Sequence, residues 1–473
     1  MILRKPENGE KGSSRLDGID EWRGLLVVFM TLDHCRLFVA HEHATEAWNA
    51  RGLSVYSNKP VAVISFIARV LSHCSAPGFH ILLGLGLPLL FRSRLQSGWT
   101  NARVALFAIS RGGCLLTVFE LLNNTAFRFG KYLQHIACRG HERRSHPWLD
   151  HDHGHVPHYA GEATAPYIWY WSVLSSLGSS MVLVSLWFSL INATASMTQH
   201  IRTSIIAKVG GIDCTFFECL HVVLLVSVSI SCALISQVVI DDARDGVHPV
   251  DIDTVSSSKD IDTVSSSPLM FLLYKLMFIP GMYGGIFIHY SVVAWLGLSF
   301  LGAAFGVILS SYSKQRLCAV MLPTGITCLL LFCGVRSGDA FGNTHMIIAI
   351  GNGSGADTVI RFLNVTKYPP SLAYSLLYGG INLVCLSLIL GSKRENFLPF
   401  VIFGRVPLFI YMLHLFVYGI LGAALWPVSC PSGLDAPWYF VVWLVGLAIM
   451  YPACRCFTSF KNRTETTSFW RLC

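Results

Sequence analysis

Hydrophobic residues in this chain form long, nearly uninterrupted stretches that alternate with polar segments. Each stretch holds roughly 20 residues, the length that a helix needs to cross the hydrocarbon core of a bilayer. The stretches lack the two-residue alternation typical of membrane barrel strands. The pattern therefore predicts an all-α polytopic membrane protein with about ten spanning helices, near residues 22–40, 70–91, 104–122, 167–191, 217–240, 291–312, 317–335, 371–391, 400–425 and 437–455.

One further apolar segment, residues 268–288, differs from the others because Pro280, Gly281, Gly284 and Gly285 interrupt it. Proline removes a backbone donor from a helix, and glycine weakens helical structure. We interpret this segment as a re-entrant or interfacial piece, with an eleventh span as the alternative.

The composition agrees with a bilayer as the main solvent, because 53% of the 473 residues are hydrophobic and only 13% are charged. A soluble domain usually carries a charged fraction of roughly 25%. The net charge of +8 comes mostly from basic loop residues, and the pattern leaves no soluble basic domain for nucleic acid. We expect the lipid bilayer as a partner and no nucleic acid.

Basic residues predict the orientation of the spans. Lys and Arg cluster before the first span, between spans two and three, six and seven, and eight and nine, and in the tail. Such clusters mark the cytosolic side of a membrane protein. Both termini are therefore expected in the cytosol, which divides the chain into a cytosolic segment 1–21, a membrane domain 22–455 with polar insertions 128–166 and 241–267, and a cytosolic tail 456–473.

Ionisable residues inside the first predicted span are the strongest indication of function. Asp33, His34 and Arg36 lie about ten residues beyond Arg23, which at about 1.5 Å per helical residue places them roughly 15 Å deeper. Charged side chains at this depth are costly and commonly mark a functional site. We interpret His34 as a general base beside the orienting carboxylate of Asp33, which Arg36 pairs with across one helical turn. The alternative is a structural polar cluster between helices.

The second span carries another histidine, His73, one turn before Pro77 and Gly78. These two residues break or kink the helix and free backbone groups that usually line a cavity. His73 is therefore a second candidate for catalysis, with a purely structural histidine as an equal alternative.

Other polar residues of the spans and their connections are candidates for substrate binding. An arginine near the cytosolic face either binds a phosphate or extends to the interface. The two prolines at 369 and 370 stiffen the segment before the eighth span, which either faces a ligand or serves as a rigid connector. The candidates, in addition to Arg36, are Arg111, Glu120, Lys367, Tyr368, Arg405 and His414.

Seven histidines crowd the first polar insertion between residues 135 and 158. Their irregular spacing among glycine and proline favours loose surface chelation over a structural zinc site, so we expect no required metal. The predicted outward loops also hold Cys138 and Cys430, and a disulfide between them is a further hypothesis.

Several sequence blocks carry a family resemblance. They are Asp-Glu-Trp-Arg-Gly at 20–24, Leu-Asp-His at 32–34, His-Cys-Ser-Ala-Pro at 73–77, Arg-Gly at 111–112, Trp-Leu-Gly at 295–297, Phe-Leu-Asn-Val-Thr-Lys-Tyr-Pro-Pro-Ser at 362–371, and Gly-Arg-Val-Pro-Leu-Phe at 404–409 with His414. In this order they resemble the transmembrane acyltransferases related to lysosomal heparan-α-glucosaminide N-acetyltransferase, and in particular their bacterial and fungal branch.

The resemblance implies an enzyme that moves an acetyl group from cytosolic acetyl-CoA to an amino sugar on the luminal side. It also implies a catalytic histidine at the luminal end of the first helix. His34 lies within that helix, and His41 and His43 lie just beyond it, so the resemblance leaves the choice among them open.

We therefore expect a membrane acyltransferase that takes acetyl-CoA or another acyl-CoA from the cytosol and a sugar or other small amine or hydroxyl acceptor from the outer or luminal side. Arg405 or nearby basic residues would hold the CoA phosphates. The alternatives are a transporter or channel whose path the buried charges line, and a metal-handling protein that uses the histidine-rich insertion. The membrane and the acceptor are not identified, and a homodimer is left open.

Overall fold

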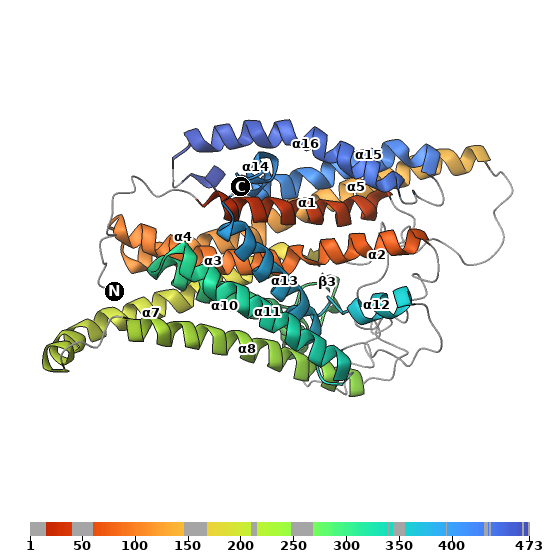
Figure 1. Ribbon diagram of the computed structural model, residues 1–473. Coiled ribbons are helices and arrows are strands. Elements are labelled where there is room, and N and C mark those ends of the chain that lie inside the picture. Colours follow the sequence, from red (N-terminus) through yellow and green to blue (C-terminus); the bar gives the residue numbers. More distant parts are fainter. Residues whose placement is uncertain are drawn as a thin grey trace.

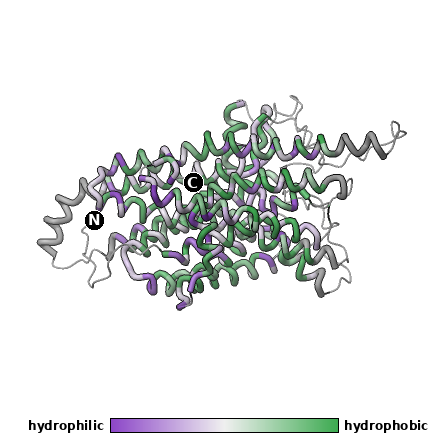
Figure 2. Tube along the Cα trace, turned by 90° about the horizontal axis from the view of Figure 1, so that it is seen from above, coloured by the Kyte–Doolittle hydropathy of each residue, from purple (hydrophilic) through white to green (hydrophobic). Residues whose placement is uncertain are grey.

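Helices make up nearly all of the structure, a computed structural model that describes residues 16–39, 60–145, 168–209, 215–246, 268–338, 340–343, 355–393, 395–429, 434, 437–465 and 468–471. The long helices lie side by side in one bundle (Figure 1), and hydrophobic residues follow most of their length (Figure 2). Within the described residues, nine helices are long and apolar enough to cross a membrane. The predicted all-α polytopic fold is therefore confirmed.

The helices correspond to the predicted spans with shifted ends, except that the ninth predicted span, 400–425, is divided into two helices at Val406. In chain order the elements are α1 (Asp17–Val39), α2 (Pro60–His73), α3 (Ser75–Gln96), α4 (Asn101–Cys114), the π-helix η2 (Leu115–Phe119), α5 (Glu120–Ser145), β1 (Trp169–Trp171), α7 (Val173–Val209), α8 (Thr215–Gly246), α9 (Pro268–Met277), β2 (Gly281–Tyr283), β3 (Ile286–Ile288), α10 (Val292–Ser311), α11 (Lys314–Gly338), α12 (Gly355–Leu363), α13 (Leu372–Gly391), α14 (Leu398–Arg405), α15 (Pro407–Ser429), α16 (Trp438–Arg463) and the 3-10 helix η4 (Phe469–Arg471).

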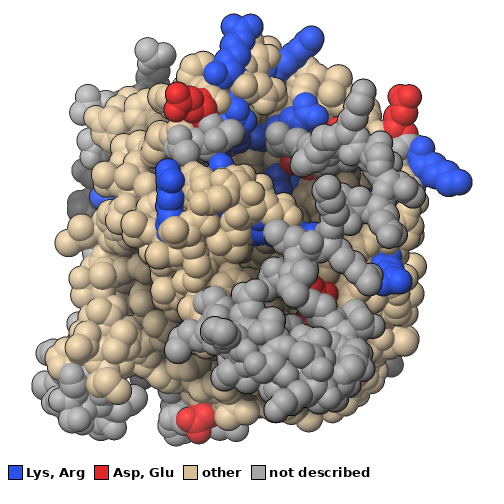
Figure 3. Space-filling model, turned by 90° about the vertical axis from the view of Figure 1, so that its left-hand side faces the viewer, with Lys and Arg blue, Asp and Glu red and all other residues tan. Residues whose placement is uncertain are grey.

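The bundle has two distinct ends, because successive long helices run in opposite directions (Figure 1). We call one end the sheet end, since it holds the three short strands and helix α12. The other is the basic end, where α3 joins α4, α10 joins α11 and α13 joins α14. Figure 3 looks onto the basic end and shows Lys and Arg side chains gathered there. The basic connections that predicted a cytosolic face therefore lie together.

Helix α1 corresponds to the first predicted span, and six other helices surround it. Its 23 residues reach about 35 Å at the helical rise, enough to cross a bilayer. It is not one of the nine apolar helices, because it carries more acidic and basic residues than they do. Helices α2, α3, α13, α14, α15 and α16 pack around it. Most of its residues are buried, so these neighbours separate its charges from lipid.

Glycines allow α1 and α14 to touch through their backbones. A Cβ atom on Gly24 would overlap the carbonyl oxygen of Phe400, and a Cβ atom on Gly404 would overlap that of Asp20. Small residues at helix crossings permit this close approach, which is typical of packing inside membranes. The crossing holds the first half of α1 against α14, near the basic end.

The apolar segment 268–288 does not form a spanning helix. Helix α9 covers only ten residues, and a hairpin of β2 and β3 follows it, paired antiparallel. Gly284 and Gly285 form the turn with φ angles of 51° and 81°, a left-handed conformation that glycine adopts readily. Strand β1 pairs in parallel with β3. The interfacial interpretation agrees with this short structure, while the small sheet itself was not predicted.

Two helices extend into segments that the sequence assigned to polar insertions. Helices α4 and α5 are joined through η2 and continue to Ser145. Residues 128–145 of the predicted first insertion are therefore helical. Helix α8 likewise continues to Gly246. Residues 146–167 and 247–267 lie outside the described residues.

Candidate functional site

A polar cavity lies between helices in the half of the bundle nearer the sheet end. Its volume is about 90 Å³, enough for a few water molecules or a small acyl group. Its walls come from α1, α2, α3, α5, β1, α7 and α15, from Tyr290 after β3 and from the segment 364–371. Its polar lining residues are Asp33, His34, Ser72, Ser75, Asn123, Tyr170, Ser172, Tyr290, Lys367, Tyr368 and Tyr411.

The sheet-end terminus of α1 is held firmly beside this cavity. The last carbonyl groups of a helix have no partner within it and need other donors when buried. Lys131 Nζ donates to the carbonyl of Leu37 at 3.1 Å, and Gln134 donates to the carbonyl of Phe38. Both donors belong to α5. The α1 side chains that line the cavity therefore project from a fixed backbone.

The two predicted histidines of the first and ninth spans meet at the cavity. His34 Nδ1 lies 2.6 Å from His414 Nε2, and His414 Nδ1 lies 3.0 Å from the carbonyl oxygen of Ile410. His34 lines the cavity, whereas His414 is fully buried behind it. The ring of Tyr411 stands edge-on to both, with centroids 6.3 and 5.5 Å away. Residues 380 positions apart in sequence thus form one hydrogen-bonded pair.

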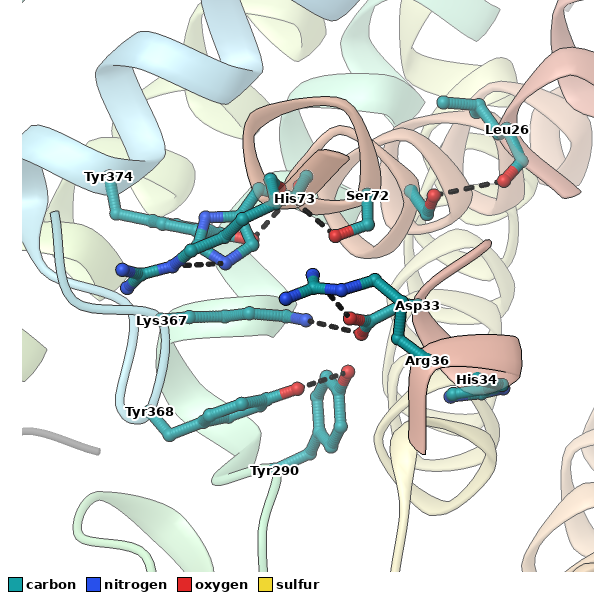
Figure 4. Close-up of polar contacts among 12 residues, drawn as sticks. Leu26, Asp33, His34, Arg36, Ser72, His73, Tyr290, Lys367, Tyr368 and Tyr374 are labelled. Atoms are coloured by element: carbon teal, nitrogen blue, oxygen red, sulfur yellow. Dashed lines mark hydrogen bonds and ion pairs between the residues drawn. The ribbon is translucent and has the colours of Figure 1, made fainter. Parts of the chain in front are cut away.

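Asp33 makes different contacts from those predicted. It lies 4.0 Å from Arg36 and 3.9 Å from Lys367 (Figure 4). His34 makes no hydrogen bond to Asp33, because its hydrogen-bond partner is His414. The contacts of the described residues do not include a hydrogen bond by which Asp33 would orient His34, and the orienting role of Asp33 stays a prediction. The pairing of Asp33 with Arg36 is present as a long contact, and Arg36 and Lys367 are both 4% exposed.

Lys367 and Tyr368 reach the cavity from the segment before α13. Lys367 and Pro370 form an isolated antiparallel bridge, and Ser371 N donates to the carbonyl of Thr366 at 3.1 Å. This compact turn directs Lys367 Nζ toward Asp33 and places the Tyr368 hydroxyl 3.0 Å from the Tyr290 hydroxyl (Figure 4). The segment therefore connects α12 to α13 through a compact turn and lines the cavity, and the interpretation that it faces a ligand stays a prediction.

His73 lies close to the cavity but does not line it. The helix is interrupted at Cys74, and Pro77 falls in the first turn of α3, where a missing N–H is tolerated. Tyr374 Oη donates to the carbonyl of His73 at 3.0 Å. Arg69 Nε points at His73 Nε2 from 3.4 Å, and the side chain is 2% exposed. The contact with Arg69 favours a structural role for this histidine beside the helix break, and its catalytic role stays a prediction.

Glu120 supports the cavity from behind. It is fully buried at the start of α5, and its oxygens accept hydrogen bonds from Ser172 N at 3.0 Å and Ser172 Oγ at 2.8 Å. Asn124, one turn later, exchanges hydrogen bonds with the backbone of Tyr170. Glu120 and Asn124 therefore fasten the wall formed by residues 170–172 and do not line the cavity themselves.

The structure places Arg111 and Arg405 away from the cavity, toward the basic end. Arg111 donates to the carbonyl of Arg471 at 3.0 Å. Arg405 pairs with Asp17 at 2.8 Å and lies 3.9 Å from Asp20. Of the predicted site residues, the structure thus gathers Asp33, His34, Lys367, Tyr368 and His414 at or beside one cavity, with Arg36, His73 and Glu120 around it.

Several residues named from the sequence lie outside the described residues: His41, His43 and Cys430, together with His146, His151, His153, His155 and His158 of the histidine-rich insertion. The backbone of Cys138 belongs to α5, and its side chain is not described. Among the described residues, no three His, Cys, Asp or Glu side chains gather as metal ligands.

Sequence reasoning missed several lining residues. Tyr411 stands three residues before His414 on the same helix, and Ser72 and Ser75 flank the helix break, so their spacing was a usable signal. Tyr170 and Tyr290 belong to or follow short strands between spans, where no periodic pattern indicates a wall.

No protein-family model matches this chain, and no curated protein matches its sequence. The class of protein therefore follows from the fold: a multi-pass, all-α membrane protein. A polar cavity with a histidine in its wall lies among its helices.

Proposed function

We propose that this protein is an acyl-CoA-dependent membrane acyltransferase, which moves an acetyl or other short acyl group to a small amine or hydroxyl acceptor such as a sugar. The observation that carries the proposal is His34, a histidine on the wall of a small polar cavity and hydrogen-bonded on its other side to His414. Imidazole accepts and returns protons near neutral pH, which is the task of a general base in acyl transfer. The family resemblance of the sequence blocks supports the same chemistry.

In this reaction His34 removes the proton from the acceptor hydroxyl or amine as its oxygen or nitrogen bonds to the thioester carbon. The carbon–sulfur bond then breaks, and the proton passes from His34 to the departing CoA thiolate. Negative charge develops on the acyl oxygen before that bond breaks, and a fixed cation stabilises such charge. Among the described residues that line the cavity, Lys367, on the wall formed by residues 364–371, carries such a positive charge.

The charges around Lys367 suit this role. Asp33 has a cation on either side, Arg36 at 4.0 Å and Lys367 at 3.9 Å. Both cations are almost fully buried, where charge interacts more strongly than in water. Lys367, buried and on the cavity wall, would therefore stabilise a transient negative charge in the cavity.

Acyl-CoA would enter from the basic end, which we place in the cytosol because it collects the basic connections. Arg405 and Arg111 lie toward that end, and a phosphate group there would compete with Asp17 for Arg405. Eleven helical residues from Arg23 to His34 correspond to roughly 16 Å. A flexible pantetheine arm covers such a distance, so the thioester reaches the cavity while the nucleotide stays at the surface. The acceptor would enter from the sheet end.

The test is acceptor-dependent release of CoA by the full-length protein in lipid nanodiscs. Acetyl-CoA is supplied with glucosamine, with glucose or without acceptor, and the free thiol and the mass of the acceptor are measured. Acetylated acceptor is the expected result. His34→Asn should lower the rate about 10²-fold or more, since asparagine keeps a donor for His414 but has no basic atom at the Nε2 position.

The matched control is His221→Asn. His221 lies on α8 outside the cavity lining and accepts a hydrogen bond from Trp187 at 3.1 Å. This variant should keep the wild-type rate. If no acceptor is acetylated and vesicles containing the protein accumulate the sugar instead, the protein is a transporter and the acyltransferase proposal is wrong.

A further inference from the structure

We propose that His414 is a positioning residue that determines which ring nitrogen of His34 is basic. This inference rests on the proposed function, and it concerns the hydrogen-bonded pair and not the identity of the substrates. His414 does not line the cavity, so it acts through His34 alone.

The two imidazole rings meet head-on. Their planes differ by 13°, their centroids are 4.8 Å apart, and the facing nitrogens are 2.6 Å apart. Rings stacked face to face would have their closest contacts between faces. Here the short approach is between His34 Nδ1 and His414 Nε2, so the rings are nearly coplanar and share one in-line hydrogen bond. A single proton must lie between these two atoms, because two protons or two lone pairs would repel at this distance.

The position of that proton follows from the other side of His414. A backbone carbonyl only accepts hydrogen bonds, so His414 Nδ1 must donate to Ile410 at 3.0 Å. A neutral imidazole has one protonated nitrogen, and His414 Nε2 therefore carries a lone pair. His34 Nδ1 must then be the donor of the 2.6 Å bond. In neutral His34 this leaves the lone pair on Nε2.

His34 Nε2 is available for chemistry. Among the described residues no group forms a hydrogen bond with this atom, and the side chain lines the cavity. Without a fixed partner, an imidazole distributes its proton between both nitrogens, and only part of the population presents the correct base. A hydrogen bond at Nδ1 fixes the proton there and leaves Nε2 as the basic nitrogen. The hydrogen-bond partner of a catalytic histidine generally has this effect.

His414 itself has little freedom to turn. It is fully buried, it is bound to its own helix through Ile410, and the rings of Tyr411 and Tyr418 stand edge-on to it with centroids 5.5 and 6.4 Å away. An acceptor fixed in this way constrains both the proton and the ring orientation of His34.

Two amide substitutions separate this role from simple packing. His414→Gln places an amide oxygen near the former Nε2 position and keeps an acceptor for His34. His414→Asn places its amide near the former Nδ1 position, where it still donates to Ile410 but offers His34 no acceptor. Both variants are polar and uncharged, and thermal unfolding shows whether they fold equally.

In the acetyl-CoA assay we expect His414→Gln to keep kcat within about tenfold of wild type and His414→Asn to lose about 10²-fold, with KM for the acceptor nearly unchanged in both. Equal activity of two equally stable variants would overturn the proposal. If both variants lose activity in proportion to lost stability, His414 has only a structural role and the proposal is also wrong.

A second measurement does not depend on turnover. Nitrogen-15 NMR of histidine-labelled protein, with His34 assigned by its loss in His34→Asn, should show a protonated Nδ1 and an unprotonated Nε2. The reverse pattern would overturn the inference whether or not the enzyme is active. If NMR shows the expected pattern but the protein transfers no acyl group, the proposed function is wrong and the assignment of the hydrogen bond still holds.

Discussion

Two glycines on the same helix, Gly84 and Gly86, should respond in opposite ways to a single methyl group. A Cβ atom on Gly84 would overlap the carbonyl oxygen of Ser299 and lie 2.8 Å from Ala303 N, both in the backbone of α10. A Cβ atom on Gly86 meets nothing within 4 Å. The variants Gly84→Ala and Gly86→Ala thus add the same atoms to the same helix, and only the first disturbs the packing of α3 on α10.

The expected magnitudes follow from this geometry. Overpacking a close contact costs about 1–3 kcal/mol, and Gly84 belongs in the upper part of that range because a helix backbone cannot rotate away as a side chain can. Alanine in place of glycine within a helix stabilises it by roughly 0.5–1 kcal/mol, which is the only effect expected at Gly86. Because the helix-propensity gain applies to both variants, they should differ by the overpacking cost alone, about 1–3 kcal/mol in the free energy of unfolding.

The assay is reversible unfolding of the purified protein in mixed micelles with an increasing fraction of sodium dodecyl sulfate, followed by circular dichroism. Wild type should lie between the two variants. Gly302→Ala provides an independent repeat from the opposite helix, because its Cβ atom would overlap the carbonyl of Ile81. Equal stabilities of Gly84→Ala and Gly86→Ala would refute the direct backbone contact between α3 and α10.

Three further predictions concern the site and its orientation. Lys367→Met should lower kcat for acyl transfer about 10²-fold with a smaller effect on KM, while Lys275→Met on α9, outside the cavity lining, should leave both unchanged. An active Lys367→Met would remove this lysine from the mechanism. Tyr374→Phe should destabilise the protein by about 1–3 kcal/mol, since the carbonyl of His73 loses its donor, and unchanged unfolding in the micelle assay would contradict this account of the helix break. An impermeant thiol reagent should label Cys473 only after the membrane is permeabilised, and labelling of intact cells would reverse the proposed side of acyl-CoA entry.

The comparison of sequence and structure is most instructive at α1. The sequence singled out Asp33, His34 and Arg36 because charge is rare in an apolar span, and the structure places Asp33 and His34 on the cavity wall. Their partners could not be predicted, because Lys367 and His414 lie 334 and 380 positions away along the chain from Asp33 and His34. Local spacing suggested that Asp33 orients His34, whereas consecutive residues on a helix point in different directions and meet different neighbours.

The small sheet and the second half of the cavity show the same limit. Gly284 and Gly285 between apolar residues were a recognisable turn, yet the pairing of β1 with β3 joins residues more than 110 positions apart. Tyr170 and Tyr290 become cavity walls only through that pairing and the contacts around it.

The sequence by itself determined that this chain forms a multi-pass helical bundle with its basic connections at one end. The physical reason is that a bilayer core requires long apolar segments with internally satisfied backbones, a constraint visible within each segment separately. Only the tertiary structure decided which polar groups share a cavity and which face away from it. Such contacts depend on how helices distant in sequence rotate and cross, and glycines such as Gly24 and Gly404 set those crossings through backbone contacts that no single segment reveals.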